Sequence, residues 1–183
     1  MSIKPTLRAA LFIAALVGGS TVYAASMSHD EYRAANARIS AEYKDSKAAC
    51  AKFADNAKDV CREEAKAKEK VARAELEYNR SGKTEDATKL ALTKAEATYA
   101  VAKEKCDDRA GNDKDVCVKE AKAAKTKAVA DAKMQRRVGE ARKDAAEDKR
   151  DADYGVAKEK CDALSGDAKA QCLATAKARY GKA

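Results

Sequence analysis

The sequence predicts an all-α protein: an elongated array of antiparallel helical hairpins, Ala-rich and coiled-coil-like, each stapled by a local disulfide. Three observations carry this prediction. Alanine is the commonest residue and charged residues make up 37% of the 183-residue chain, and alanine, lysine and glutamate are strong helix formers. The single proline is Pro5, so no proline interrupts a helix after it. The six cysteines fall into three pairs of identical spacing, Cys-x10-Cys.

The first residues have the pattern of a cleaved signal peptide over residues 1–24. Lys4 and Arg8 flank the start of an apolar run, and Val22 and Ala24 then stand three and one positions before the expected cleavage site. The run is shorter than the roughly 20 apolar residues of a transmembrane helix, so we expect no integral membrane anchor. We therefore expect a periplasmic or secreted protein, cleaved near Ala24, in a compartment that favours disulfides.

Residues 25–183 are expected to form a helical repeat region. Its three units start about 55 residues apart, and each has a tyrosine seven residues before its first cysteine and an Ala-Lys-Ala triplet after its second. Hairpins are expected around residues 43–67, 99–123 and 154–178. Six cysteines permit fifteen pairings. The local pairs are the ones that the repeat predicts: Cys50–Cys61, Cys106–Cys117 and Cys161–Cys172.

The centre of each unit has the residues of a turn between two helices. Gly111 suits a left-handed residue that ends one helix, and Asn112 suits the N-cap of the next. The first cysteine of a pair then lies in the last turn of one helix, and the second lies in the opening turns of the next. The equivalent turn and cap residues are Gly166 and Asp167 in the third unit, and Asp55 and Asn56 in the first.

Capping signals set the bounds of the first three helices. Ser28 and Glu31 have the spacing of a capping box, which predicts a first helix over residues 29–54. A second helix is expected over residues 57–80. Gly82 would end it, and Thr84 would cap a third helix that runs to about residue 109.

Residues 114–163 are predicted to form one helix of about 50 residues, roughly 75 Å long. The alternative is a break near Gly139, which would fold the second and third hairpins back on each other. The sequence favours the single helix, because no second turn residue accompanies Gly139.

The spacing of the cysteines argues against a metal centre or a redox site. Structural zinc sites bring ligands two to four residues apart, and thiol oxidoreductases use Cys-x-x-Cys. His29 is the only histidine, and the sequence contains neither a Gly-rich phosphate loop nor a nucleophile elbow. We therefore expect no enzyme activity, no metal and no cofactor. A thiol-based metal or redox sensor is a third hypothesis, and it predicts free thiols.

A basic stretch in the third quarter of the chain is the candidate binding site for anions. Its cations are Lys122, Lys125, Lys127, Lys133, Arg136 and Arg137. The formal net charge of +8 permits weak attraction to anionic surfaces, although 30 acidic residues dilute the 38 basic ones. The alternative function is thus a binder of anionic polymers. Export disfavours nucleic acid and favours an envelope polysaccharide.

The motif KEKCDDRAGNDKDVCVKEAKA, residues 103–123, resembles that of small exported Ala/Lys-rich proteins of Gram-negative bacteria. Such proteins are often labelled cell-envelope or Tol-A-like. The resemblance implies an envelope compartment and no settled activity. The expected function is a non-enzymatic structural or interaction role in the cell envelope, with envelope components or another helical protein as partners and an open oligomeric state.

Overall fold

The computed structural model describes residues 27–182, so the predicted signal peptide lies outside the described residues. The elements are α-helices and two short 3₁₀ helices, labelled η. Their order is α1 (His29–Ala49), η1 (Cys50–Lys52), α2 (Asp55–Ser81), α3 (Thr84–Lys105), η2 (Cys106–Asp108), α4 (Gly111–Asp162) and α5 (Gly166–Tyr180). The prediction of an all-α array of antiparallel hairpins is confirmed.

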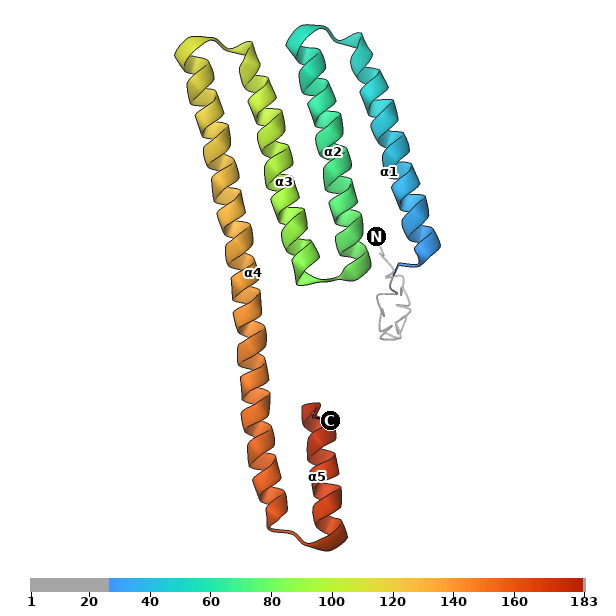
Figure 1. Ribbon diagram of the computed structural model, residues 1–183, viewed down its shortest axis with the longest axis vertical. Coiled ribbons are helices and arrows are strands. Elements are labelled where there is room, and N and C mark those ends of the chain that lie inside the picture. Colours follow the sequence, from blue (N-terminus) through green and yellow to red (C-terminus); the bar gives the residue numbers. More distant parts are fainter. Residues whose placement is uncertain (1–26, 183) are drawn as a thin grey trace, which may run out of the picture.

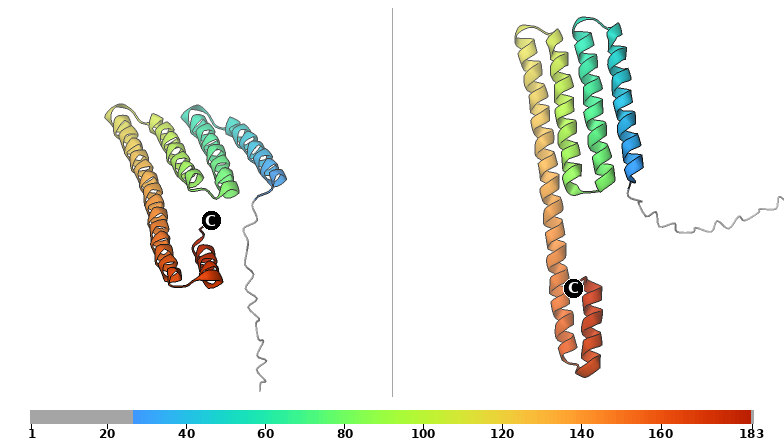
Figure 2. Two further views of the ribbon diagram at one scale, coloured as in Figure 1. Left: turned by 60° about the horizontal axis from the view of Figure 1, so that its bottom comes forward. Right: turned by 45° about the vertical axis from the view of Figure 1, so that its right-hand side comes forward.

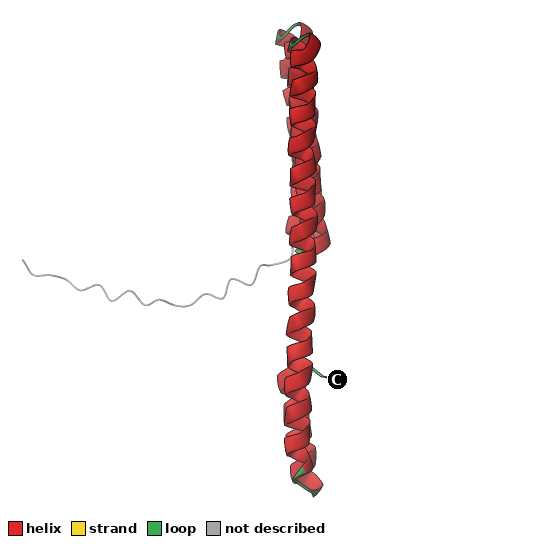
Figure 3. Ribbon diagram, turned by 90° about the vertical axis from the view of Figure 1, so that its left-hand side faces the viewer, coloured by secondary structure: helices red, strands yellow, loops and turns green. Residues whose placement is uncertain are grey.

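The helices form a single layer. Helices α1 to α4 lie side by side in chain order, and α5 packs against the C-terminal part of α4, on the side where α3 packs higher up (Figure 1). Figure 2 shows the same arrangement from two other directions. In the edge-on view of Figure 3 the array is about one helix thick. Each helix packs chiefly against its neighbours in the chain, so both broad faces of the layer meet solvent.

Small residues form the thin core of this layer. The buried side chains are those of the first cysteine of each pair, of several alanines and of one leucine: Cys50, Ala65, Ala74, Leu76, Ala95, Ala97, Cys106, Ala132, Cys161 and Ala176. Alanine lets neighbouring helices approach at the low end of the usual 8–10 Å between axes. The array therefore gains little from bulky apolar contacts, and its corners must contribute much of its stability.

The start of α1 and the end of α2 follow the predicted signals. The Ser28 N–H donates to Oε2 of Glu31 at 2.8 Å, and the Glu31 N–H donates to Oγ of Ser28 at 3.2 Å, which completes the capping box. The backbone hydrogen bond from Ser28, and then that of its side chain, hold the pKa of Glu31 below its usual range. Gly82 ends α2 in the left-handed conformation, with φ of 62°. The predicted cap Thr84 is wrong, because Lys83 is the N-cap and Thr84 already lies in α3.

Helices end earlier at the corners than the sequence predicted. The first helix stops at Ala49 and the third at Lys105, and a 3₁₀ turn begins in each case at the cysteine that follows. Backbone hydrogen bonds from Phe53 to Cys50 and from Arg109 to Cys106 close these turns. The third corner has no 3₁₀ helix, because α4 continues through Cys161 to Asp162.

The left-handed turn residues are confirmed, but their role differs from the predicted one. Asp55, Gly111 and Gly166 have φ of 46°, 54° and 56°. Each is the first residue of the following helix, and none ends the preceding one. The N-caps are the extended residues just before them, none with a side-chain capping bond: Ala54, Ala110 and Ser165. The predicted N-caps are therefore wrong, since all three lie inside the first helical turn: Asn56, Asn112 and Asp167.

The first corner has the least suitable turn residue. Asp55 is the one non-glycine residue with positive φ among residues 27–182. A left-handed conformation costs an L-residue about 1–2 kcal/mol, which glycine avoids. Part of this advantage is lost because glycine has a larger conformational entropy in the unfolded chain. We expect Asp55→Gly to raise the free energy of unfolding by about 0.5 kcal/mol in urea titrations. The reverse change Gly111→Asp should lower it; shifts of the same sign would contradict this account.

Helix α4 crosses the predicted break without interruption. It has 52 residues, about 78 Å at 1.5 Å per residue, and an added Cβ at Gly139 would meet nothing within 4 Å. The single-helix prediction is confirmed. Residues 133–153 are exposed without exception, because α3 packs only before this segment and α5 only after it.

Candidate functional site

A disulfide links the two helices at each of the three corners. The pairs are the local ones predicted, with Cα–Cα distances of 5.6, 5.7 and 5.6 Å for Cys50–Cys61, Cys106–Cys117 and Cys161–Cys172. No cysteine of the described chain is free. Each first cysteine is at most 1% exposed, so the bond is shielded at one end. A thiol sensor would require these same sulfurs in their reduced form.

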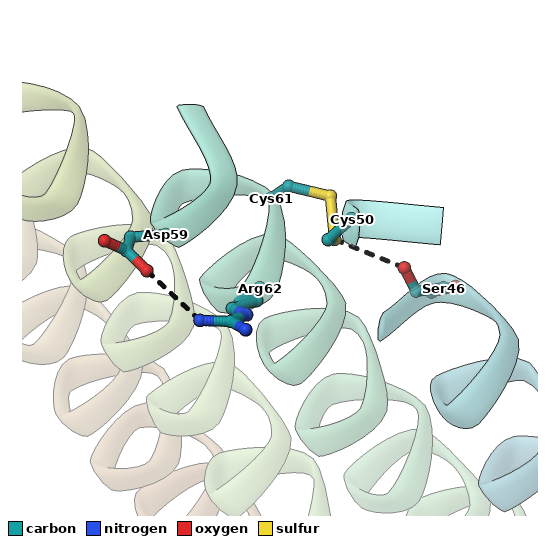
Figure 4. The surroundings of a disulfide bond; sticks show 5 residues. All are labelled: Ser46, Cys50, Asp59, Cys61 and Arg62. Carbon is teal, nitrogen blue, oxygen red and sulfur yellow. Dashed lines mark hydrogen bonds and ion pairs between the residues drawn. A yellow bond between two sulfur atoms is a disulfide. The ribbon is translucent and has the colours of Figure 1, made fainter. Parts of the chain in front are cut away.

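Figure 4 shows the first corner. Cys50 lies in η1 and bonds to Cys61 in the second turn of α2, and its sulfur lies 3.2 Å from the carbonyl oxygen of Ser46. Asp59 and Arg62 form an ion pair of 3.5 Å on the neighbouring surface of α2. The corner thus presents helix ends and exposed charges, and its sulfurs point into the seam between the helices.

Corners two and three each contain an ion pair that the first corner lacks. Lys114 Nζ lies 2.8 Å from Asp107 Oδ1, and Lys169 Nζ lies 2.8 Å from Asp162 Oδ1. The hydrogen bond from Lys169, and then its charge, lower the pKa of Asp162; the equivalent bond to Asp107 raises the pKa of Lys114. Ala51 occupies the equivalent place in the first unit. The pairs hold the two arms together in a second way beside the disulfide.

The repeated tyrosines Tyr43, Tyr99 and Tyr154 lie in the seams between helices. The ring of Tyr99 lies 4.9 Å from the ammonium group of Lys125 on the next helix. Tyr154 on α4 meets Tyr180 on α5 with ring centroids 6.3 Å apart. Tyr43 lines the groove between α1 and α2. These rings extend the contact between the arms beyond each corner, which is a structural role.

A polar seam between α1 and α2 was not visible in the sequence. Arg73 pairs with Glu69, four residues earlier on α2, at 2.9 Å, and it also donates to Oδ1 of Asn36 and Oγ of Ser40, both at 2.9 Å. Only the register of the two helices brings these groups together.

Tyr32 and Glu77 form a second contact across the same seam. The Tyr32 hydroxyl donates to the Glu77 carboxylate, and this bond lowers the pKa of Glu77 below its usual range. The guanidinium of Arg80 also lies 3.0 Å from Glu77 and 4.7 Å from the ring of Tyr32. The N-terminal end of α1 is thereby attached to the C-terminal end of α2.

A groove with a volume of about 860 Å³ runs between α2 and α3. Its floor is alanine and valine, including Val71 and Val101. Ion pairs of 2.7 Å bridge it at both ends: Lys105–Glu64 and Lys94–Glu75. The groove is open to solvent, and its carboxylates are already engaged by lysines. In residues 27–182 no three metal-ligating side chains gather at one place.

The candidate anion-binding cations do not form one patch. Lys125 pairs with Glu96 on α3, and Arg136 lies 3.7 Å from Glu140. Lys127 lies five residues from Lys122, about 140° away around the helix. Only three of the six remain on one side of α4, spread over about 22 Å: Lys122, Lys133 and Arg137.

This dispersal predicts weak binding of anionic polymers. Three cations spread along a helix contact few anionic groups of a polymer at once and release few counterions, so the affinity should be low. A low salt concentration should then be enough to release the polymer. We expect the protein to elute from heparin below about 0.15 M NaCl, where the screening length is about 8 Å. Replacing the three cations with glutamine should then change the elution little. Retention of the protein at higher salt, lost in the glutamine variant, would contradict this prediction.

The fold and the corners define a structural class: a single-layer array of antiparallel helical hairpins with a disulfide at each corner. In the part of the chain that the structure describes, no helix is long and apolar enough to cross a membrane. No protein-family model matches the sequence, and neither the curated proteins nor the solved structures contain a match.

Proposed function

We propose that the protein is a non-enzymatic structural protein of the cell envelope, exported to the periplasm or the medium, in which α4 is a rigid spacer. The observation that carries this proposal is the exposed segment 133–153. It is about 30 Å of unsupported helix between the α1–α4 hairpins at one end and the α4–α5 hairpin at the other. A chain selected only for compactness has no reason to keep two hairpin bodies apart at this distance.

The disulfides support an exported location. Three local disulfides fit an oxidising compartment and are rare in a reducing cytosol. Each disulfide also makes its hairpin rigid, and it does so with a short segment of chain, since the two cysteines are 11 residues apart. Rigid ends on a rigid rod are what a spacer requires, and the open grooves offer surfaces for partners rather than an enclosed reaction site.

The location is tested by mass spectrometry of the unreduced protein from fractionated cells. We expect the mass of residues 25–183 minus six hydrogens, found in the periplasm or the medium. A cytosolic protein that retains residues 1–24, or one whose thiols react with an alkylating agent before reduction, would overturn the exported structural role.

The spacer is tested by deleting residues 137–147. Eleven residues make three helical turns, so the hairpins keep their relative phase while the rod shortens by about 16 Å. The matched control keeps the length and keeps Val138, Ala141, Arg142 and Ala145, and it replaces the other residues of this segment with Glu, Lys and Ala. Small-angle scattering should show the shortening, and only the control should restore the envelope phenotype of a strain that lacks the gene. Restoration by the shortened variant would contradict a spacer role.

A further inference from the structure

The outer surface of α4 carries an apolar stripe without a partner. Helices α3 and α5 both pack on the same side of α4, so its opposite side is open along the whole length (Figures 1 and 2). The apolar residues there recur at three-, four- and seven-residue spacings, and all of them are exposed: Val116, Ala123, Ala130, Met134, Val138, Ala141, Ala145, Ala152 and Val156. We call this set the outer stripe.

The outer stripe gathers the large apolar side chains that α4 exposes. Seven such side chains are exposed in the described part of the chain, and four of them belong to the stripe. Val116, Met134, Val138 and Val156 have exposed fractions of 45%, 47%, 39% and 56%. Two charged residues, Lys127 and Asp148, stand in the seven-residue gaps of the outer stripe. The exposed apolar residues that make up the rest of this side of α4 indicate an interaction surface.

The four large residues are placed symmetrically along the helix. Val116 and Val156 lie 20 residues before and after residue 136, and Met134 and Val138 lie two residues before and after it. From Val116 to Met134, and from Val138 to Val156, the chain makes five helical turns of about 3.6 residues, which keeps them on one side. A pattern symmetric about its midpoint is self-complementary when a second copy runs in the opposite direction.

We propose that the outer stripe is a homodimer interface, in which a second copy of this chain packs its α4 antiparallel to the first. The two-fold axis lies near residue 136. Val116 then lies opposite the partner's Val156, and Met134 lies opposite the partner's Val138. The two single layers join edge to edge into one wider layer. The dimer is closed, because each copy has one α4.

Charges along one flank of the outer stripe reverse their sign at the same midpoint. Three acids precede residue 136 and three cations follow it, all about 40–80° from the centre of the stripe: Asp113, Glu120 and Asp131, then Arg142, Lys149 and Lys160. In the antiparallel dimer this flank faces its own copy. Asp131 meets the partner's Arg142, Glu120 meets the partner's Lys149, and Asp113 meets the partner's Lys160. Each pair occurs twice.

These six charges have no ion-pair partner within residues 27–182. The ion pairs of α4 use other residues: Lys114, Lys125, Arg136, Glu140, Asp151 and Asp162. The flank is therefore available to a second copy. An amphipathic helix of another protein could bind the outer stripe, but its binding would not require the charges of α4 to reverse sign at residue 136. An antiparallel second copy does require this reversal. Charge complementarity thus selects the second copy as the occupant.

The size of the contact fits a reversible dimer. The outer stripe spans 41 residues, about 60 Å, and a helix contact is roughly 10 Å wide. This gives about 600 Å² per copy and about 1,200 Å² in total, the lower end of specific interfaces. We expect sedimentation velocity to show dimers that dissociate on dilution across the micromolar range. A monomer at every concentration, or assembly beyond the dimer, would overturn the proposal.

The apolar part of the interface is tested by Val138→Asp. It places a charge beside the axis in both copies and should weaken dimerisation at least about tenfold, with helicity unchanged by circular dichroism. The matched control is Leu164→Asp, which changes an equally exposed apolar side chain outside the outer stripe, 44% exposed. Equal effects of the two substitutions would contradict the assignment of the interface.

The antiparallel register is tested by exchanging charges. Asp131→Arg alone and Arg142→Asp alone should each weaken the dimer about tenfold, because like charges then meet across the axis. The double variant should restore it, and so should an equimolar mixture of the two single variants. A parallel dimer, or a contact through another surface, would show neither restoration, and that outcome would overturn the register.

Discussion

Replacing both Cys106 and Cys117 with alanine is expected to lower the free energy of unfolding by about 3 kcal/mol. The disulfide closes a separation of 11 residues, and the chain-entropy model assigns about this value to a loop of a dozen residues. The buried residues of α3 and of the part of α4 beside it are alanines apart from Cys106 itself, so little apolar burial compensates for the loss. Urea unfolding followed by circular dichroism measures the change.

The third corner provides the comparison for this prediction. Helix α5 packs only against α4 in the described molecule, so losing Cys161–Cys172 should release α5 and leave α1 to α3 protected. Hydrogen exchange should show fast exchange confined to α5 and the adjoining end of α4. If the two corners gave the same global loss of protection, the hairpins would unfold as one unit and the local model of the corners would be wrong.

Truncating Leu76 to alanine is expected to cost about 3 kcal/mol. Leu76 is the one large aliphatic side chain buried among residues 27–182, with 6% of its surface exposed, in a layer one helix thick whose other buried side chains are alanines and cysteines. The cavity cannot be refilled from a second layer. Leu164→Ala, at a leucine that is 44% exposed, should change stability by less than about 0.5 kcal/mol. Equal shifts of the thermal midpoint in the two variants would contradict a core role for Leu76.

Local sequence patterns predicted most of the fold. The cysteine spacing and the repeated turn residues specify contacts between residues close in the chain, so the hairpins and disulfides could be predicted from the sequence. The same local signals predicted the uninterrupted α4. The caps of the corners could not be predicted, because at all three corners the left-handed residue begins the next helix and the N-cap before it makes no side-chain capping bond.

The side-chain contacts between helices could not be predicted from the sequence. The reach of Arg73 to Asn36 and Ser40, and the pairing of Glu64 with Lys105, depend on the register of neighbouring helices. The basic stretch shows the same limit. Nearness in sequence suggested one patch, whereas the helix turns Lys127 away from Lys122 and α3 engages Lys125. The outer stripe of α4 became visible only when α3 and α5 were seen to share one side of that helix.

The order of the cysteines bears on how the protein matures. Every native disulfide joins a cysteine to the next one along the chain, and every helix packs on the one made just before it. An oxidant that links each cysteine to its predecessor as the chain emerges would therefore produce the native set among the fifteen possible, with no later reshuffling by an isomerase. Each hairpin can close before the next is synthesised or translocated, and such short-range contacts fold quickly.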